Sequence, residues 1–244
     1  MIVVLKIPYD ASIVESHRRG ASKGPDIIQK ELGGKGVWKN VTIDEGDFSN
    51  TLEFIRKTAK KEYDKNNFVI GLGGDHSISY GLVKAFLEKY PKGGLIVFDA
   101  HLDCMDNFYP PTHEDWLRVL IEKENFDKVL VLGARKIHRL EKEFSKANSL
   151  RVSKDPNLES IKDFIKDFND IYISIDIDFI DSKYAPGTGW PEKGGISPEK
   201  AKKLLEFLKK TGKVKGMDLA ELSPPKDINN ITNKVAVSLL SGFF

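Results

Sequence analysis

Acidic and imidazole side chains follow an apolar segment near the middle of the chain. Residues 95–98 are all apolar and predict a fully buried strand of a parallel sheet. Asp99, His101 and Asp103 come next, two residues apart each time, so an extended backbone would point all three to one side. A cluster of unpaired acids would repel itself and therefore needs cations. The spacing predicts a metal site.

Three further expected strands also end in groups that can bind metal or hold a cation. They are His76 after strand 68–72, Asp176 and Asp178 after strand 171–175, and Glu221 after strand 214–219. In a parallel sheet all carboxyl ends lie at one edge, so these groups would meet there. A set of nitrogen and oxygen ligands without thiolate suits Mn²⁺, Fe²⁺ or Co²⁺ better than a structural zinc. Four aspartates exceed the demand of one divalent ion, and two ions that share carboxylates would activate water for hydrolysis.

The elements that must position these groups alternate between strand and helix along the whole chain. The expected strands are 2–7, 37–43, 68–72, 95–98, 128–132, 150–152, 171–175 and 214–219. The expected helices are 25–32, 79–89, 114–122, 138–147, 157–168, 198–210 and 231–240, with one more that Asn50 or Thr51 caps and that runs to about residue 65. This alternation predicts an α/β protein whose central, mostly parallel sheet is covered on both faces. Since no linker or internal repeat interrupts the pattern, one domain is expected over residues 1–244.

Composition narrows the class of partner. Lys and Arg number 38 against 36 Asp and Glu, so no strong overall charge favours nucleic acid or an anionic membrane. No apolar run approaches the ~20 residues that would span a bilayer, and a strand expected at residues 2–7 leaves no apolar segment of a signal peptide before it. The lone Cys104 excludes an intramolecular disulfide and suits a reducing compartment. A soluble cytoplasmic protein is expected.

Five segments, in order, resemble the successive signatures of the ureohydrolase family, which includes arginase, agmatinase and formimidoylglutamase. They are GGDHSIS at 73–79, FDAHLDCMD at 98–106, SIDIDFID at 174–181, APGTGWPEKGG at 185–195 and MDLAELSPP at 217–225. The earlier GASKGPDII, residues 20–28, is similar to the family's glycine-proline turn. Each motif alone is weak evidence, but the ordered set is specific. The resemblance implies a three-layer α/β/α fold and a homo-oligomer, a trimer or a hexamer.

The resemblance also implies two Mn²⁺ ions per chain and assigns their ligands. His76 and Asp103 would bind the first ion, His101 and Asp178 the second, and Asp99 and Asp176 would bridge the two. The implied reaction is hydrolysis of a C–N bond in a guanidino compound to urea and an amine.

The implied catalytic residues are Glu221, Asp103 and His113. Glu221 would face the substrate's guanidinium, a planar cation that a carboxylate can bind with both oxygens. His113 would act as a proton shuttle, and Thr188 and Trp190 would line the substrate pocket beside Glu221.

Three departures from the family pattern concern the pocket. Trp190 replaces a small hydroxyl residue, Glu114-Asp115 follows His113 where agmatinases carry Gly-Thr, and Asp181-Ser182 replaces Asp-Pro. Agmatine is the favoured substrate, because residues 185–187 resemble agmatinases and the loop 107–116 lacks the Ser/Asn-rich pattern of arginases. Arginine or another guanidino acid is the second choice and formimidoylglutamate the third. The alternative from another class is a metal-binding protein without activity, in which Trp190 blocks the pocket.

Several of these residues also have structural interpretations. His76 alone could be a hydrogen-bonded core histidine, and Asp176 with Asp178 could cap a turn. His113 could equally be a surface residue. Trp116 and Trp190 could stack on a cationic substrate or merely fill space. Three residues are expected outside the ligand set: Cys104 as a buried small hydrophobe, and His17 and His138 at the surface or the pocket rim.

Overall fold

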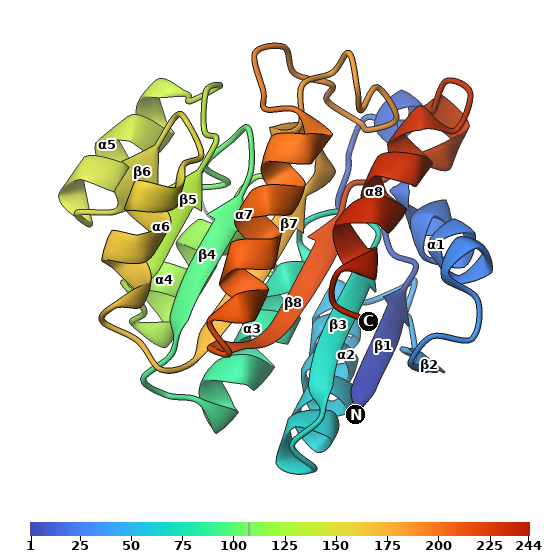
Figure 1. Cartoon of the computed structure of the whole chain (residues 1–244), viewed down its shortest axis with the longest axis horizontal. Coiled ribbons are helices and arrows are strands. Elements are labelled where there is room, and N and C mark those ends of the chain that lie inside the picture. Colours follow the sequence, from blue (N-terminus) through green and yellow to red (C-terminus); the bar gives the residue numbers. More distant parts are fainter. Residues whose placement is uncertain (107) are drawn as a thin grey trace.

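Eight parallel strands form one sheet that takes strands from the whole length of the chain (Figure 1). The computed structural model describes residues 1–106 and 108–244. The strands are β1 (Ile2–Ile7), β2 (Val37–Asn40), β3 (Phe68–Gly73), β4 (Gly94–Phe98), β5 (Val129–Leu132), β6 (Arg151–Ser153), β7 (Ile171–Asp176) and β8 (Val214–Ala220). Their order across the sheet is β2-β1-β3-β8-β7-β4-β5-β6, and every neighbouring pair is parallel.

Helices cover both faces of the sheet and complete three layers. One face carries α1 (Gly24–Leu32), α6 (Leu158–Ile165), α7 (Pro198–Lys210) and α8 (Ile231–Ser241); the other carries α2 (Phe48–Asp64), α3 (Ile78–Lys89), α4 (Trp116–Glu124) and α5 (Arg139–Ala147). In Figure 1, α6, α7 and α8 lie in front of the sheet, and α2, α3 and α4 lie behind it. The predicted α/β/α fold is confirmed.

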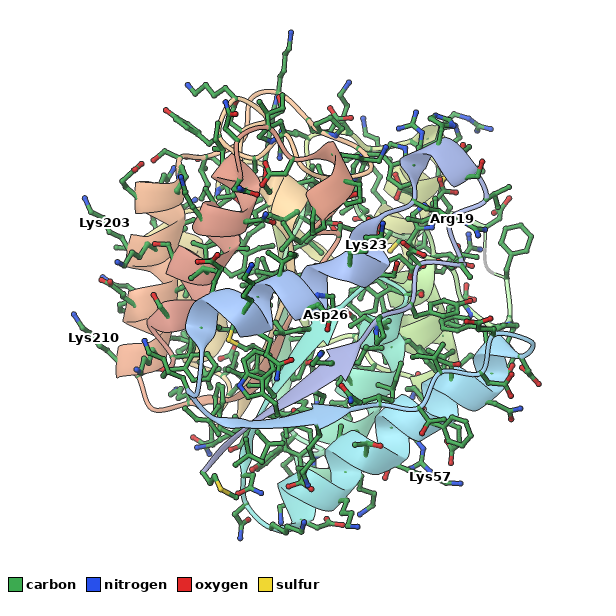
Figure 2. All side chains as sticks on the ribbon, turned by 90° about the vertical axis from the view of Figure 1, so that its right-hand side faces the viewer. Arg19, Lys23, Asp26, Lys57, Lys203 and Lys210 are labelled. Carbon is green, nitrogen blue, oxygen red and sulfur yellow. The ribbon has the colours of Figure 1, made fainter. Side chains whose placement is uncertain are left out.

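Side chains of the central strands alternate between two hydrophobic cores. In β4, Ile96 and Phe98 pack in the core below α6, α7 and α8, while Leu95 and Val97 pack in the core against α2, α3 and α4. Because both faces are covered, these strands read as continuous apolar runs instead of alternating ones. The charged residues lie on the outer helix faces: Lys57 of α2 and Lys203 and Lys210 of α7 project away from the sheet (Figure 2).

The start of α2 differs from the prediction. Asp47 caps it by accepting a hydrogen bond from the Ser49 backbone N–H at 2.8 Å, so the helix begins at Phe48. The prediction of Asn50 or Thr51 as the cap is wrong, because the Thr51 hydroxyl instead accepts from the Asp44 backbone N–H at 2.8 Å. In α7, Ser197 is the cap: its hydroxyl accepts from the Lys200 backbone N–H at 3.3 Å.

Other element ends differ by a few residues from those expected. β2 ends at Asn40, α4 begins at Trp116 and α6 ends at Ile165. Among the described residues, no helix combines the length and apolarity needed to cross a membrane.

Gly74 fixes the turn that follows β3. Its N–H donates to Ile7 O at 3.0 Å, and its carbonyl accepts from the Glu221 N–H at 2.8 Å, so it joins the ends of β1 and β8. A Cβ on Gly74 would lie 1.6 Å from Tyr9 O. Only glycine allows this approach of two backbones, and the approach places the following residues 75 and 76 at the sheet edge.

We therefore expect Gly74→Ala to be destabilising by about 3 kcal/mol, the upper end for overpacking, because the backbone at Tyr9 must move. Urea denaturation measures this free energy of unfolding. Gly34→Ala is the matched control, since a Cβ there meets nothing within 4 Å. Equal midpoints for the two variants would contradict the role given to Gly74.

Candidate active site and metal centre

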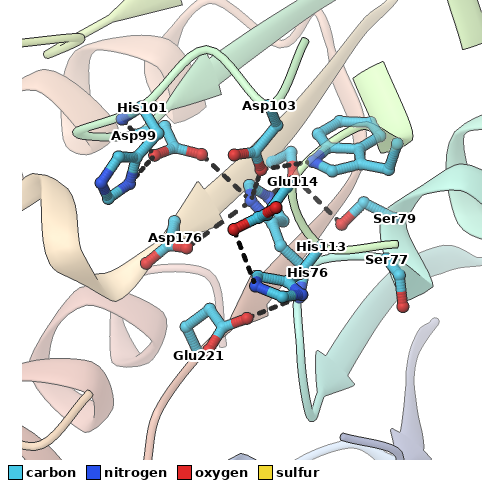
Figure 3. A network of polar contacts seen from close by, with 12 residues as sticks. His76, Ser77, Ser79, Asp99, His101, Asp103, His113, Glu114, Asp176 and Glu221 are labelled. Carbon is cyan, nitrogen blue, oxygen red and sulfur yellow. Dashed lines mark hydrogen bonds and ion pairs between the residues drawn. The ribbon is translucent and has the colours of Figure 1, made fainter. Parts of the chain in front are cut away.

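The predicted metal ligands meet at the carboxyl edge of four adjacent strands, β3, β8, β7 and β4 (Figure 3). His76 follows β3, Glu221 follows β8, Asp176 and Asp178 lie at the end of β7, and Asp99, His101 and Asp103 follow β4. Although up to 145 residues separate them in sequence, the sheet order brings them together. The predicted convergence is present.

Three aspartates surround His76. Its Nδ1 lies 2.9 Å from an Asp103 oxygen, 3.0 Å from Asp99 Oδ2 and 3.6 Å from Asp176 Oδ2. His76, Asp99 and Asp176 offer ligand atoms within 4.8 Å of one another, a spacing that one metal ion can bridge. This group corresponds to the first predicted ion.

A second group forms around His101. Its Nδ1 lies 3.0 Å from Asp178 Oδ2 and 3.5 Å from Asp99 Oδ1. Asp99 therefore contributes one oxygen to each group, as a bridging ligand would. Asp176 falls in the first group alone, so its bridging role stays a prediction.

Backbone N–H groups hold one oxygen of each of four site carboxylates. The Oδ1 atoms of Asp99, Asp176 and Asp178 accept from the N–H of residues 101, 178 and 100 at 2.7–3.0 Å, and Glu221 Oε1 accepts from the His76 N–H at 3.0 Å. The second oxygen of each aspartate then faces a histidine of the site. For Asp176 the interpretation as a turn cap is confirmed, because Oδ1 caps the turn Ile177–Phe179. Its Oδ2 faces His76, and its role as a metal ligand stays a prediction.

Trp116 supports Asp103 from behind. Its ring is fully buried, its Nε1–H donates to Asp103 Oδ2 at 2.8 Å, and its centroid lies 4.9 Å from that of His76. Of the two interpretations of Trp116, the structure supports the space-filling one, because the ring is fully buried and does not line the cavity described below. Asp103 and Glu221 also have positive φ angles, 49° and 62°, which non-glycine residues adopt rarely and mainly at functional sites.

A buried hydrogen-bond chain sets the orientation of His76. Its Nε2 lies 2.9 Å from Ser174 Oγ, which donates to Asp218 at 2.8 Å; Tyr172 donates to the other Asp218 oxygen. Since the Ser174 proton goes to the carboxylate, Ser174 accepts from Nε2–H, and the Nδ1 lone pair of the neutral ring faces the aspartates. Neither Ser174 nor Asp218 was predicted as a supporting residue, although both lie within the segments 174–181 and 217–225 that resemble the family.

The donor set fits divalent cations. Within the described part of the chain, the buried atoms His76 Nδ1, Asp99 Oδ2 and Glu221 Oε2 have no hydrogen-bond partner, although the first two lie only 3.0 Å apart. Such atoms are costly to bury unless an ion binds them. Imidazole nitrogen and carboxylate oxygen, without any sulfur, are also suitable ligands for Mn²⁺.

Electrostatics show the same need for positive charge. Burial and the neighbouring Asp99 raise the pKa of Asp103 to about 8, and burial with nearby carboxylates raises the pKa of Asp176 well above its usual range. Burial alone would lower the pKa of His76, but the carboxylates of Asp103 and Asp99 outweigh it and raise that pKa. The cluster therefore binds protons or metal ions strongly, and the two compete.

A cavity of about 380 Å³ opens onto this cluster. Eight predicted site residues line it: His101, Asp103, His113, Asp176, Asp178, Thr188, Trp190 and Glu221. Four residues that the sequence did not single out also line it: Met105, Lys136, Ile137 and Glu141. Three of them follow β5, whose end carries no acidic or histidine side chain; position after a strand of the parallel sheet was the only available signal.

Trp190 forms part of the cavity wall. Its ring lies 4.7 Å from that of His113, and the Arg18 guanidinium lies 4.7 Å from the Trp190 centroid and donates to Gly189 O. The cavity remains open beside it, which argues against a pocket blocked by Trp190. His113 is only 8% exposed, so the reading of it as a surface residue is wrong.

The remaining predictions concern residues near the site. His138 is exposed and lines the cavity rim, and His17 is exposed, as expected. Cys104 is fully buried, which confirms its expected place as a small core residue. The loop 107–116 begins at Asn107, which lies outside the described residues.

We expect Asp99→Asn to reduce retained metal from two ions to none, because Asp99 belongs to both ligand groups. Asp178→Asn is the matched variant and should retain one ion, since Asp178 belongs to the second group alone. Elemental analysis after dialysis against Mn²⁺-free buffer gives the ion content per chain. Equal retention by the two variants would contradict a shared Asp99.

Comparisons with known proteins agree with this geometry. All residues, 1–244, match the family described as the arginase family. The agmatinase of Bacillus subtilis (strain 168) is 32% identical over 213 residues, which cover 84% of this chain and 73% of that protein.

Two solved structures share the fold. The arginase from Bacillus subtilis has a TM-score of 0.87 at 24% identity and covers 99% of this chain and 97% of its own. The formimidoylglutamase from Bacillus subtilis subsp. subtilis str. 168 has a TM-score of 0.89 at 22% identity. The match covers 99% of this chain and 85% of the formimidoylglutamase chain. At these identities the structures establish the fold alone, but with the full-length family match the conclusion is plain: the chain belongs to the arginase family.

Proposed function

We propose that this protein is a two-manganese hydrolase that cleaves the C–N bond of a guanidino compound to urea and an amine, with agmatine favoured. The observation that carries the proposal is Glu221 Oε2, a buried carboxylate oxygen without a hydrogen-bond partner at a cavity shared with two ligand groups. Membership of the arginase family and 32% identity to an agmatinase support the same reaction class.

The two groups that share Asp99 support His76, Asp99 and Asp176 as ligands of the first ion, and His101, Asp99 and Asp178 as ligands of the second. As the family resemblance implies, Asp103 would complete the first set and Asp176 would also join the second. When bound, a Mn²⁺ pair supplies Lewis-acid activation of water.

Glu221 binds and orients the guanidinium. Its Oε1 is held by the His76 N–H, its Oε2 is free, and the side chain is only 3% exposed. A planar cation with N–H groups in a fork matches such a carboxylate, and low exposure strengthens the pairing. The guanidino carbon is thereby directed toward the two ligand groups.

His113 can move the proton that the leaving amine requires. Its Nε2 is buried, has no hydrogen-bond partner among the described residues, and belongs to a ring that lines the cavity. Burial lowers the pKa of His113 to about 4, so the ring is neutral near pH 7 and can accept a proton before it donates one.

The charges around the cavity favour a substrate with a cationic tail. Glu114 and Glu141 line it, whereas the basic Lys136 lies 3.6 Å from Glu192. Glu141 is 5% exposed and accepts from two backbone N–H groups, and no basic side chain of the described residues lies within ion-pair distance. Agmatine ends in an ammonium group, while arginine and formimidoylglutamate carry carboxylates that these glutamates would repel.

Urea release tests the reaction. With the Mn²⁺-loaded protein we expect urea from agmatine at a rate above that from arginine, guanidinobutyrate and guanidinoacetate, and none from Asp176→Asn. A colorimetric urea assay over the four compounds measures this. If the wild type binds two ions and releases no urea from any of them, the proposal fails, and formimidoyl compounds are the next substrates to assay.

Tail recognition has a separate test. Glu141→Gln should raise KM for agmatine about tenfold, roughly 1.4 kcal/mol, because a buried charge pair with the ammonium is lost. KM for butylguanidine, which lacks that ammonium, should not change. Glu143→Gln is the matched control, since Glu143 is an exposed residue of the same helix that pairs with Arg139. Parallel KM changes for both substrates would show that Glu141 does not contact the tail.

The family resemblance supports an oligomeric assembly, and the lone Cys104, which suits a reducing compartment, supports the location. We propose a homo-oligomer, a trimer or a hexamer, in the cytoplasm.

A further inference from the structure

The loop after β1 brings Ser12 against His113, 101 residues away in the sequence. Ser12 Oγ donates a hydrogen bond to Asp75 Oδ2 at 2.7 Å, and the Ser12 backbone N–H donates to the same oxygen at 3.2 Å. On its other side, Ser12 Oγ accepts from the His113 backbone N–H at 3.2 Å and lies 3.4 Å from His113 Nδ1. Asp75 is fully buried and joins no metal-ligand group.

This arrangement specifies where the His113 proton sits. A hydroxyl has one proton and two lone pairs, and the Ser12 proton is committed to the Asp75 carboxylate. Toward His113, Ser12 Oγ can therefore only accept, which favours a proton on Nδ1. In the neutral ring the lone pair then lies on Nε2, a buried atom that makes no hydrogen bond among the described residues. A Glu114 carboxylate oxygen lies 3.9 Å from Nε2, beyond hydrogen-bond distance (Figure 3).

Trp190 and Arg18 restrict the plane of the same ring. Trp190 lies 4.7 Å from His113 at an interplanar angle of 31°. Arg18 packs over the Trp190 ring and donates a hydrogen bond to Gly189 O at 3.2 Å. Arg18 thus contacts both Trp190 and the backbone of the residue before it, which restricts the position of the tryptophan. The small residue expected at position 190 could not make such a ring contact.

We propose that Asp75 and Ser12 are positioning residues that hold His113 as the Nδ1-protonated tautomer, with Nε2 presented to the cavity, and that Trp190 fixes the ring plane. The kinetic consequence depends on the proposed function, whereas the tautomer does not.

The proton path balances with Nε2 as the shuttle atom. A C–O bond forms between water and the guanidino carbon, and the C–N bond breaks with its electron pair left on the nitrogen. One water proton passes to Nε2 and from there to that nitrogen, and the other converts the released amine to ammonium. The opposite tautomer would present an N–H to the cavity and could not accept the first proton.

Nitrogen NMR of the full chain tests the tautomer directly. In protein labelled with ¹⁵N-histidine, with and without diamagnetic Zn²⁺, long-range ¹H–¹⁵N correlations at pH 7 should show His113 with a protonated Nδ1 and a bare Nε2. His113→Asn assigns the signals. In Ser12→Ala this preference should be lost. A wild-type His113 protonated mainly on Nε2 would overturn the proposal.

Kinetics of the Mn²⁺-loaded enzyme test the consequence. Ser12→Ala should lower kcat about tenfold and change KM less than about twofold. The loss in kcat is a part of the ~10²–10⁴-fold rate acceleration that general acid–base catalysis contributes. Ser12→Thr, which keeps the hydroxyl, should restore most of kcat, and Ser16→Ala, an exposed serine of the same loop, should change nothing.

A double-mutant cycle distinguishes a role of Ser12 in positioning His113 from a general loss of activity caused by the substitution. In a His113→Asn background, Ser12→Ala should cause no further loss, because the group it positions is gone. An equal loss in both backgrounds would overturn the proposal. An inactive wild type would refute the proposed function instead, and the tautomer measurement would still decide the role of Ser12.

Discussion

Repulsion among five buried carboxylates is the constraint on which this structure depends. Asp99, Asp103, Asp176, Asp178 and Glu221 converge at one sheet edge with two imidazoles as their neighbours. Their mutual repulsion in a medium of low dielectric would open the site unless positive charge were bound. In the proposed function, two divalent cations would offset four of these charges, and one guanidinium would offset the fifth. The charge that favours metal binding would thus also favour a cationic substrate once the ions are bound.

The order of the strands in the sheet determines where these carboxylates lie. Strands β3, β8, β7 and β4 are adjacent in the sheet. In sequence β4 is the next strand after β3, yet β8 and β7 lie between them in the sheet. Neighbouring parallel strands lie ~4.8 Å apart, so ligands from adjacent strand ends come within reach of shared ions. Residues that follow the outer strand β5 reach the substrate cavity instead, as Lys136 and Ile137 do.

The sequence predicted those parts of the molecule that depend on local periodicity. Continuous apolar runs identified the buried strands, and polar residues directly after them identified the cluster of histidines and carboxylates, because both follow from a parallel sheet with covered faces. Contacts between loops could not be predicted in this way. The fit of Ser12 to Asp75 and His113, and of Trp116 to Asp103, depends on loop conformations that no period encodes. The cap of α2 was missed because Asp47, Asn50 and Thr51 all have capping side chains, and only the Asp44 contact distinguishes them.

One structural rule links the metal ligands to the proposed proton shuttle. Glu221, His76 and His113 each contact a backbone N–H or a hydroxyl through one polar atom, and the opposite atom makes no hydrogen bond. Glu221 is held at Oε1 and free at Oε2; His76 is held at Nε2 by Ser174 and faces the aspartates with Nδ1. His113 shows the mirror case: Nδ1 lies against Ser12, and Nε2 makes no hydrogen bond. Because the hydroxyl in each histidine pair gives its own proton to a buried carboxylate, Asp218 or Asp75, the neutral forms of the two imidazoles would be opposite tautomers. On the proposed function, this difference separates a histidine that would bind metal from one that would transfer a proton.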